Sequence, residues 1–284
     1  MRTVAFYLNA HRPRALEFAR GAAGLAAARG LRVALADEQH DLIDLGVEQA
    51  NLADADLIVS FGGDGTLLRA MRLAVPLDVP VFGINTGRLG FLTEIDEHDD
   101  VLNELARVFD GSFRVEERVA LEAAINGEGA HFALNDVVVR RASNARMAPF
   151  GLSLDDEPVA RLPSDGIIVA TPTGSTAYFL SAGGPIISPG VEAFGIAALL
   201  PHTLFARPLI VPTSSTITIT VDSESMHANL DIDGTLAGDL APGDMVSVRR
   251  APRPAKFART RPDGFFSRLE EKLQWGVPIK RDAG

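Results

Sequence analysis

The pattern of short apolar segments changes near residue 112, and this change constrains the fold more than any other feature of the sequence. Before it, strand-like and helix-like segments alternate, which is typical of a parallel sheet covered by helices. The expected strands are 3–8, 31–36, 56–61 and 79–84, and the expected helices are 13–29, 66–74 and 99–109. This part of the chain therefore predicts an α/β domain.

After residue 112 the apolar segments become short, β-branched and alternating, and turn pairs such as Asn126-Gly127 and Asp233-Gly234 separate them. Such a pattern favours a mainly antiparallel β structure with a sandwich or layered sheets. We predict an N-terminal α/β domain with a parallel, Rossmann-like sheet at 1–112 and a mainly β, sandwich-like C-terminal domain at 113–258. The tail at 259–284 is expected to pack back on the N-terminal domain, with an amphipathic helix within 262–275.

Charge and cysteine content narrow the class of protein. The formal net charge of −10 argues against nucleic acid or an anionic membrane as the main partner. The sequence contains no cysteine, which excludes disulfides, thiolate catalysis and thiolate zinc sites and is compatible with a reducing compartment. The N-terminal residues lack the features of a signal peptide, and no apolar run is long enough for a membrane span. We therefore expect a cytoplasmic protein.

The segment FGGDGTLL joins an apolar strand to a helix through a glycine-rich turn, an arrangement that directs backbone N–H groups at an anion. Gly62, Gly63 and Gly65 would let a phosphate approach closely, and Thr66 could cap the helix. Asp64 would repel a phosphate unless it holds a divalent cation or accepts a proton from an attacking hydroxyl. The alternative is an ordinary loop with Asp64 as the helix cap. The turn lacks the spacing of a P-loop or of a GxGxxG dehydrogenase motif.

A second unusual segment, SDGIIVATPTGSTAYFLSAGGP, places clustered hydroxyl groups between a buried strand and a short helix. The hydroxyls of Thr171, Thr173, Ser175 and Thr176 could bind ribose hydroxyls or phosphates. Tyr178 offers an aromatic face and a polar tip for a ribose or a base. The alternative is that the hydroxyls stabilise the turn and that Tyr178 belongs to the core.

Asn135 and Asp136 interrupt the apolar segment HFALNDVVVRR, where buried polar groups without partners are unfavourable. They could form a bulge or a turn, or they could bind a ribose or an amide. None of the six histidines has the HExxH spacing of a zinc site, so no metal-ligating residues are predicted.

The motifs GGDGTLL, NTGRLGF, LNDVVV and SDGIIVATPTGSTAY, in this order, closely resemble those of the NAD kinase family, and the resemblance covers most of the chain. GGDGT is shared with lipid kinases, whereas TPTGSTAY together with LND is more specific. The family has an N-terminal α/β domain and a C-terminal β domain that binds NAD. The resemblance implies transfer of the γ-phosphoryl of ATP to the 2′-hydroxyl of the adenosine ribose of NAD, giving NADP. Polyphosphate remains open as a donor.

The resemblance also implies roles for individual residues. Asp64 is the catalytic proton acceptor, Gly65 lies against the nucleotide, Arg69 is a basic contact and Phe91 packs beside a base. Asn135 and Asp136 hold the nicotinamide side of NAD or its ribose. The other binding positions implied are Gly62, Gly63, Thr66, Arg146, Asp165 and the adenosine-wrapping segment Thr176, Ala177, Tyr178, Phe179, Leu180 and Ser181. Thr235 stands where many family members have glutamine after Asp-Gly, which places one secondary contact in doubt.

The expected partners are the small molecules NAD and ATP with Mg²⁺, the ion being held largely by phosphate oxygens and water. The resemblance suggests a homodimer or homotetramer. Two rival functions remain open. A lipid kinase of the diacylglycerol or sphingosine type would need an apolar entry surface, and a non-catalytic NAD-binding sensor would not need Asp64.

Overall fold

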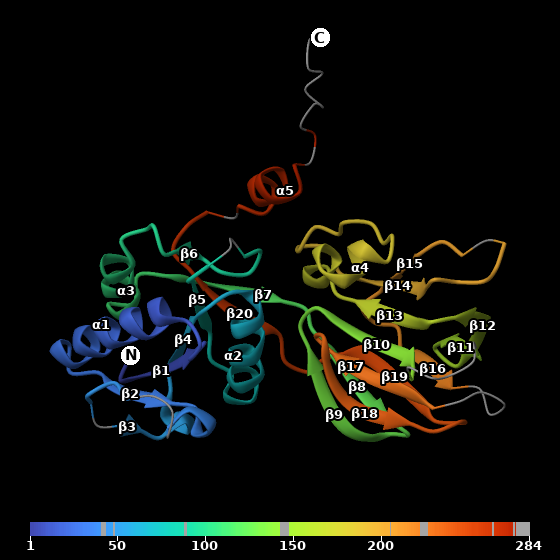
Figure 1. Cartoon of the computed structure of the whole chain (residues 1–284), viewed down its shortest axis with the longest axis horizontal. Helices are drawn as coiled ribbons and strands as arrows, with labels where there is room; N and C mark the ends of the chain where they lie inside the picture. The colour runs from blue at the N-terminus through green and yellow to red at the C-terminus, as the bar shows by residue number, and fades with distance from the viewer. Residues whose placement is uncertain are drawn as a thin grey trace, which may run out of the picture. The chain divides into compact units, whose positions relative to one another are not determined.

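The computed structural model describes residues 1–40, 44–47, 49–87, 90–142, 148–204, 206–221, 227–262, 264–274 and 276. The chain forms two compact units (Figure 1). The first unit comprises Met1–Glu116 and Lys256–Gly284, and the second unit comprises Glu117–Ala255. The chain therefore begins the first unit, builds the whole second unit and then returns to the first.

The first unit contains an eight-stranded sheet with the order β3-β2-β1-β4-β5-β20-β7, and β6 pairs with β5. The strands are β1 (Thr3–Leu8), β2 (Arg32–Leu35), β3 (Gln49–Ala50), β4 (Leu57–Phe61), β5 (Val81–Asn85), β6 (Ile95–Asp96), β7 (Arg114–Arg118) and β20 (Ala255–Arg259). Strand β1 is parallel to β2 and β4, and β5 is parallel to β4, β6 and β20. The predicted α/β fold with a parallel sheet is confirmed.

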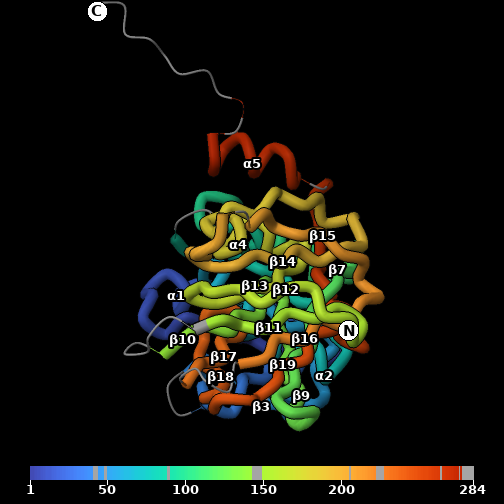
Figure 2. Tube along the Cα trace, turned by 90° about the vertical axis from the view of Figure 1, so that its right-hand side faces the viewer, coloured from blue at the N-terminus to red at the C-terminus, as the bar shows by residue number. Residues whose placement is uncertain are grey.

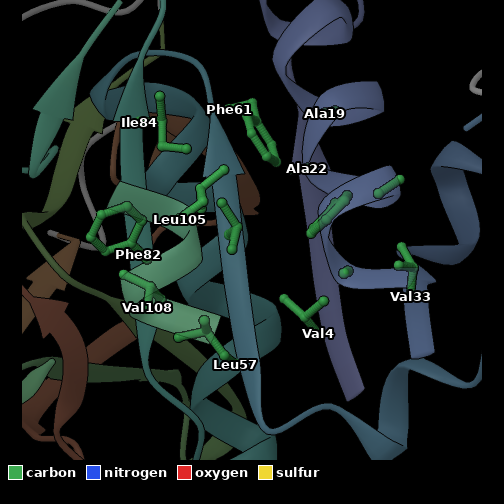
Figure 3. Close-up of a cluster of buried hydrophobic side chains, with 14 of the residues drawn as sticks. Val4, Ala19, Ala22, Val33, Leu57, Phe61, Phe82, Ile84, Leu105 and Val108 are labelled. Atoms are coloured by element: carbon green, nitrogen blue, oxygen red, sulfur yellow. The ribbon is translucent and has the colours of Figure 1, made fainter. Parts of the chain in front are cut away.

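Four helices accompany this sheet: α1 (Pro13–Ala28), α2 (Asp64–Leu77), α3 (Val101–Phe109) and α5 (Phe265–Leu273). Helices α1 and α3 share one core cluster with β1, β2, β4 and β5, shown in Figure 3. The buried face of α1 consists of alanines, among them Ala19 and Ala22, so the helix backbone lies close to Val4 and Val33. Helix α2 packs on β4, β5 and β1 through residues outside that cluster, including Leu67 and Met71. Helices thus cover both faces of the sheet, which accounts for the apolar sequences of its strands.

The second unit consists of two antiparallel sheets with the orders β15-β14-β13-β10-β17-β18 and β12-β11-β16-β19-β8-β9. Their strands are β8 (Leu121–Ile125), β9 (Glu128–Ala133), β10 (Asp136–Arg141), β11 (Ala148–Leu154), β12 (Glu157–Ser164), β13 (Gly166–Ala170), β14 (Ala193–Leu199), β15 (Leu209–Pro212), β16 (Ile217–Val221), β17 (Ala228–Ile232), β18 (Thr235–Leu240) and β19 (Met245–Arg250). Figure 2 looks onto this unit, whose strands run from green to orange.

One core cluster joins the facing sides of the two sheets, with Val139, Val169 and Leu230 from one sheet and Phe150 and Ile219 from the other. The predicted sandwich-like β fold is therefore confirmed. The first sheet is also covered on its outer side, where Phe179 of helix α4 (Tyr178–Ser181) packs with Ile168. Strand β13 is buried on both faces for this reason, and its sequence is an uninterrupted apolar run.

Two hairpin turns follow the sequence expectation. Asn126 and Gly127 have φ values of 51° and 79°, and Asp233 and Gly234 have φ values of 47° and 73°. Two consecutive residues with positive φ are the requirement of the turn type that suits a twisted two-strand hairpin.

In the described part of the chain, no helix is long and apolar enough to cross a membrane.

Candidate active site

The glycine turn lies at the carboxyl end of β4, and helix α2 begins directly after it, with Gly63 in the N-cap position. A Cβ atom on Gly62 would lie 2.2 Å from Oγ1 of Thr66, so the protein itself requires glycine there. A Cβ on Gly63 or Gly65 would meet no atom within 4 Å, so these two glycines leave open space above the turn. The N–H groups of the first helical turn have no intrahelical acceptor and can bind an anion there. The expectation that Thr66 caps the helix is wrong, because Gly63 holds that position.

Asp64 is the first residue of α2, and its carboxylate is held by another loop. Oδ2 accepts a hydrogen bond from the N–H of Phe91 at 2.7 Å, and Oδ1 accepts one from the N–H of Leu92 at 3.0 Å. A Cβ on Gly90 would lie 2.0 Å from Oδ1, so the close approach of this loop depends on glycine. The alternative role of Asp64 as a helix cap is therefore wrong. Because each carboxylate oxygen can accept a second hydrogen bond, Asp64 is oriented and still able to accept a proton.

Arg69, one and a half turns further along α2, is exposed and lies near the end of β1. There the hydroxyl of Tyr7 donates to Oε1 of Glu38 at 2.9 Å. Burial, and then Glu38, raise the pKa of Tyr7 to about 12, and the charge of Arg69 partly opposes this shift. The carboxyl ends of β1 and β4 thus present a cation and the oriented Asp64 carboxylate at one edge of the sheet, which is where open α/β sheets bind ligands.

A buried ion cluster supports the loop that holds Asp64. Nη1 of Arg259 donates to the carbonyl oxygen of Leu92 and to Oε2 of Glu94, both at 3.0 Å, and Nε donates to Oε2 of Glu116 at 2.8 Å. The side chains of Arg259 and Glu94 are each 3% exposed. The other oxygen of Glu94 accepts the N–H groups of Thr260 and Arg261. This cluster was not predicted, because its members lie far apart in the sequence.

In the second unit, the carboxylate of Asp233 organises the Asn135-Asp136 segment. Its oxygens accept hydrogen bonds from the N–H groups of Leu134 at 3.0 Å, Asn135 at 2.7 Å and Asp136 at 3.2 Å. Leu134 and Asn135 form the break between β9 and β10, and Asp136 is the first residue of β10, so the segment HFALNDVVVRR is divided between two strands. The break leaves the side chain of Asn135 half-buried and that of Asp136 buried.

Burial raises the pKa of Asp136 to about 7, and the nearby carboxylates of Asp233 and Asp231 add to the shift. The folded protein therefore keeps this proton at pH values where the unfolded chain has lost it. As a result, the free energy of unfolding falls as the pH rises from about 4 through 7.

Replacement of Asp136 by asparagine removes this pH dependence. We expect Asp136→Asn to unfold with a free energy at least about 1 kcal/mol higher than that of the wild-type chain at pH 8, the equivalent of one pKa unit. The difference between the two proteins should be smaller at pH 5, because the free energy of unfolding of the wild-type chain falls progressively from about pH 4 through 7. Urea unfolding at both pH values measures the difference, with the exposed Asp239→Asn as a control that should show neither effect. Equal unfolding free energies at pH 8 would contradict the expected burial penalty.

Most hydroxyl groups of the TPTGST turn donate hydrogen bonds to backbone carbonyl oxygens of the protein. Oγ1 of Thr171 donates to the carbonyl oxygen of Leu134 at 2.6 Å, and Oγ of Ser175 donates to that of Pro172 at 2.6 Å. Thr171 and Ser175 are both fully buried. Oγ1 of Thr176 also donates to the carbonyl oxygen of Thr173 at 3.3 Å, so the turn-stabilising alternative is correct for these three residues, and Thr176 and Ala177 lie half-buried just before α4.

Gly174 connects this turn to the Asn135-Asp136 segment. A Cβ on Gly174 would lie 2.0 Å from the carbonyl oxygen of Asn135 and 2.4 Å from the carbonyl carbon. Because backbone atoms cannot yield as a side chain can, we expect Gly174→Ala to lower the free energy of unfolding by about 1–3 kcal/mol. Gly190→Ala, whose Cβ meets no atom within 4 Å, is the matched control and should change it by less than about 0.5 kcal/mol. Equal denaturation midpoints for the two variants would show that the turn tolerates the clash.

Tyr178 is 48% exposed, so the alternative that places it in the core is wrong. It lines a cavity of about 550 Å³ together with Ser181, Asp165, Arg140 and Arg141. The two arginines follow each other at the end of β10, and each is paired with a carboxylate. Arg140 binds Asp231, and Nε of Arg141 donates to Oδ1 of Asp165 at 2.7 Å. These two arginines were not predicted as site residues, although two adjacent charges at the end of an apolar strand could have indicated them.

The other predicted residues differ in exposure. Phe179 is fully buried and packs against Gly184 and Gly195, so its side chain belongs to the core. Leu180 is half-buried, and Phe91 is half-buried beneath Lys272. Arg146 lies outside the described residues. Among the described residues, no group of three or more histidine, aspartate or glutamate side chains is arranged to hold a metal ion.

A glycine turn with an oriented carboxylate in an α/β unit, and a cavity lined by Tyr178 and two arginines in a β unit, are features that suit a phosphotransferase acting on a nucleotide. Residues 10–113 match the family model of the ATP-NAD kinase N-terminal domain, and residues 134–260 match that of the ATP-NAD kinase C-terminal domain. The chain belongs to the NAD kinase family.

Individual relatives agree with this family. The chain is 42% identical to an NAD kinase from Heliobacterium modesticaldum over 283 residues, which cover 97% of this chain and 100% of that protein. It is 40% identical to an NAD kinase from Methanothermobacter thermautotrophicus, with 91% and 92% coverage. Among solved structures, it is similar to a yeast NADH kinase complexed with NADH, with a TM-score of 0.86, 26% identity and coverage of 99% of this chain and 89% of that one. An NAD kinase from Archaeoglobus fulgidus in complex with ATP gives a TM-score of 0.74, 26% identity and coverage of 96% and 99%.

Proposed function

We propose that this enzyme transfers the γ-phosphoryl group of ATP to the 2′-hydroxyl of the adenosine ribose of NAD. The observation that carries the proposal is the Asp64 carboxylate, which two backbone N–H groups hold at the glycine turn. A carboxylate in this position would be unfavourable beside phosphates unless it takes part in the chemistry. The chain's similarity to NAD and NADH kinases gives the substrate.

In the proposed reaction, Asp64 accepts the proton of the 2′-hydroxyl as the ribose oxygen attacks the γ-phosphorus of ATP. The new bond joins the ribose oxygen to that phosphorus, and the bond from the γ-phosphorus to the bridging oxygen breaks, so that ADP leaves. The open space above Gly63 and Gly65 and the N–H groups at the start of α2 receive phosphate oxygens. Arg69 supplies further positive charge at the same edge. Catalysis then rests on alignment and charge neutralisation.

We propose that NAD binds the second unit through the cavity lined by Tyr178, Ser181 and Asp165. The exposed ring of Tyr178 can pack on a base or ribose, and in this proposal Asn135 and Asp136 hydrogen-bond the dinucleotide. Arg140 and Arg141 add cations at the rim of this cavity.

We also propose that Mg²⁺ enters with ATP. Such an ion keeps several water ligands and binds phosphate oxygens with one or two carboxylates, so it does not require a cage of protein ligands. The glycine turn fits this way of binding Mg²⁺, because the carboxylate oxygens of Asp64 retain free lone pairs next to the proposed phosphate position. When bound, the ion would neutralise charge on the transferred phosphoryl group.

The proposed assembly is a homodimer or homotetramer. Support comes from β15 at one end of its sheet, where Leu209 and Ile210 are 41% and 48% exposed. Leu200 and Leu204, in the connection that precedes β15, are also exposed. Large apolar side chains exposed so close together in the sequence are candidates for an interaction surface. Light scattering of the purified protein measures the mass, and a monomer at micromolar concentration would contradict the assembly.

Because NAD and ATP are substrates of the cell interior, we propose that the enzyme acts in the cytoplasm.

The test uses purified protein with NAD, ATP and Mg²⁺, and an NADP-dependent dehydrogenase that reports NADP. Formation of NADP at a rate proportional to enzyme concentration supports the proposal. Binding of NAD without turnover would favour the sensor, and phosphorylation of diacylglycerol or sphingosine without NADP formation would favour the lipid kinase. Polyphosphate in place of ATP identifies the donor.

A further inference from the structure

Helix α5 places a lysine beside the loop that holds Asp64. The helix belongs to the first unit, and its anchors Phe265 and Leu269 are 7% and 4% exposed, whereas Phe266 is 72% exposed. Lys272 follows Leu269 by three residues and therefore lies on the same side of the helix as the two anchors. Its side chain is half-buried.

The ammonium group of Lys272 lies over the ring of Phe91, with Nζ 4.2 Å from the ring centroid. The N–H of the same Phe91 donates to Oδ2 of Asp64. Lys272 and Asp64 therefore approach one short loop segment from two different helices, and the charge of Asp64 acts on the ammonium group. Within the described part of the chain, no carboxylate lies at ion-pair distance from Nζ of Lys272.

The environment of Lys272 favours binding of an anion to its ammonium group. Burial lowers the pKa of its ammonium group, and the charges of Asp64 and Glu271 oppose this effect while Arg268 adds to it. An aromatic face stabilises a cation by only about 0.5–2 kcal/mol, less than a charged hydrogen bond in a site shielded from water. A phosphate oxygen at the glycine turn would supply such a bond, since the start of α2 already attracts phosphate to the vicinity of Asp64.

We propose that Lys272 binds a phosphate oxygen of the nucleotide at the Gly62–Gly65 turn, beside Asp64. This inference rests on the proposed function and adds a substrate-binding residue to it. The phosphate belongs either to the triphosphate of ATP or to the diphosphate of NAD, both of which present the same oxygen chemistry. Helix α5 thereby becomes part of the active site, and its anchors Phe265 and Leu269 determine whether the ammonium group reaches the substrate.

The experiment compares Lys272→Met, which removes the charge, with Lys272→Arg, which keeps it. Lys256→Met is the matched control, because Lys256 belongs to the same unit but pairs with Asp78 at 2.8 Å. The measurements are kcat, the KM for ATP and the KM for NAD, together with calorimetric binding of ATP–Mg²⁺ alone and of NAD alone. Thermal unfolding of every variant reports any loss of folding.

We expect Lys272→Met to lower kcat/KM by about 10- to 100-fold, the usual effect of one hydrogen bond to a charged group. Lys272→Arg should recover most of this loss, and Lys256→Met should match the wild-type chain. A weaker binding of ATP–Mg²⁺ identifies the triphosphate as the ligand, and a weaker binding of NAD identifies the diphosphate.

Kinetic and binding constants within twofold of wild type in Lys272→Met would overturn the proposal. Equal losses in the Met and Arg variants, accompanied by a lower Tm in both, would also overturn it, because the lysine would then be purely structural. If wild-type protein forms no NADP, the proposed function fails. The binding measurements still decide whether Lys272 contacts a phosphate.

Discussion

Asp64→Asn is expected to lower kcat for NADP formation by about two to four orders of magnitude, the usual contribution of a positioned proton acceptor. The asparagine side chain has nearly the same shape, and its carbonyl oxygen can still accept one of the two N–H groups that now bind Asp64. Its amide nitrogen cannot accept the other N–H or take the proton of the ribose hydroxyl. The coupled dehydrogenase assay measures kcat, and calorimetry measures NAD binding, which should persist.

Asp54→Asn is the control for this prediction. Asp54 belongs to the same unit, and its side chain is 50% exposed in a surface pair with Arg32. This variant should keep wild-type turnover, since exposed ion pairs contribute little. Wild-type-like turnover in Asp64→Asn would remove Asp64 from the chemistry. Loss of activity caused only by unfolding would appear as a lower Tm together with lost NAD binding.

Arg259→Met is expected to lower the free energy of unfolding of the first unit by about 3–5 kcal/mol, because it removes the buried guanidinium that binds the carboxylates of Glu94 and Glu116. It also removes the hydrogen bond to the carbonyl oxygen of Leu92. Since the N–H groups of Phe91 and Leu92 hold Asp64, kcat should fall even at temperatures where the variant stays folded.

Urea unfolding followed by circular dichroism measures the first effect, and the coupled assay at low temperature measures the second. Arg32→Met is the matched control, because the side chain of Arg32 is 57% exposed and its pair with Asp54 is solvated. This variant should change the unfolding free energy by less than about 1 kcal/mol. A similarly small change in Arg259→Met would mean that the buried carboxylates are protonated or hydrated without the arginine.

The fold class could be predicted from the periodicity of apolar residues and from the turn residues, because both depend on the local sequence. The strand 3–8 has the expected bounds, and both Asn-Gly and Asp-Gly turns adopt the positive φ values that their turn type requires. Strands β11 and β12 were not predicted. They contain Pro149, Pro158 and Pro163, which are typical of loops, and only pairing with each other and with β16 makes them strands.

The residues of the candidate site were predicted from motifs, but not the contacts that orient them. The three hydrogen bonds from residues 134–136 to Asp233 join positions almost a hundred residues apart. The same applies to Arg259 and Leu92. No local periodicity encodes such pairs, and the single signal in the sequence was a polar side chain where an apolar one was expected.

The place of β20 in the first sheet has a consequence for biosynthesis. This strand lies between β5 and β7, yet the ribosome makes it only after the entire second unit. The nascent N-terminal segment therefore cannot complete its sheet while it emerges, and the part of β5 near Val81 that β6 does not pair stays open until Ala255–Arg259 are made. The second unit, which is continuous in sequence, has no such delay. Chains released before residue 259 would display that open edge, and we expect them to aggregate or to be degraded.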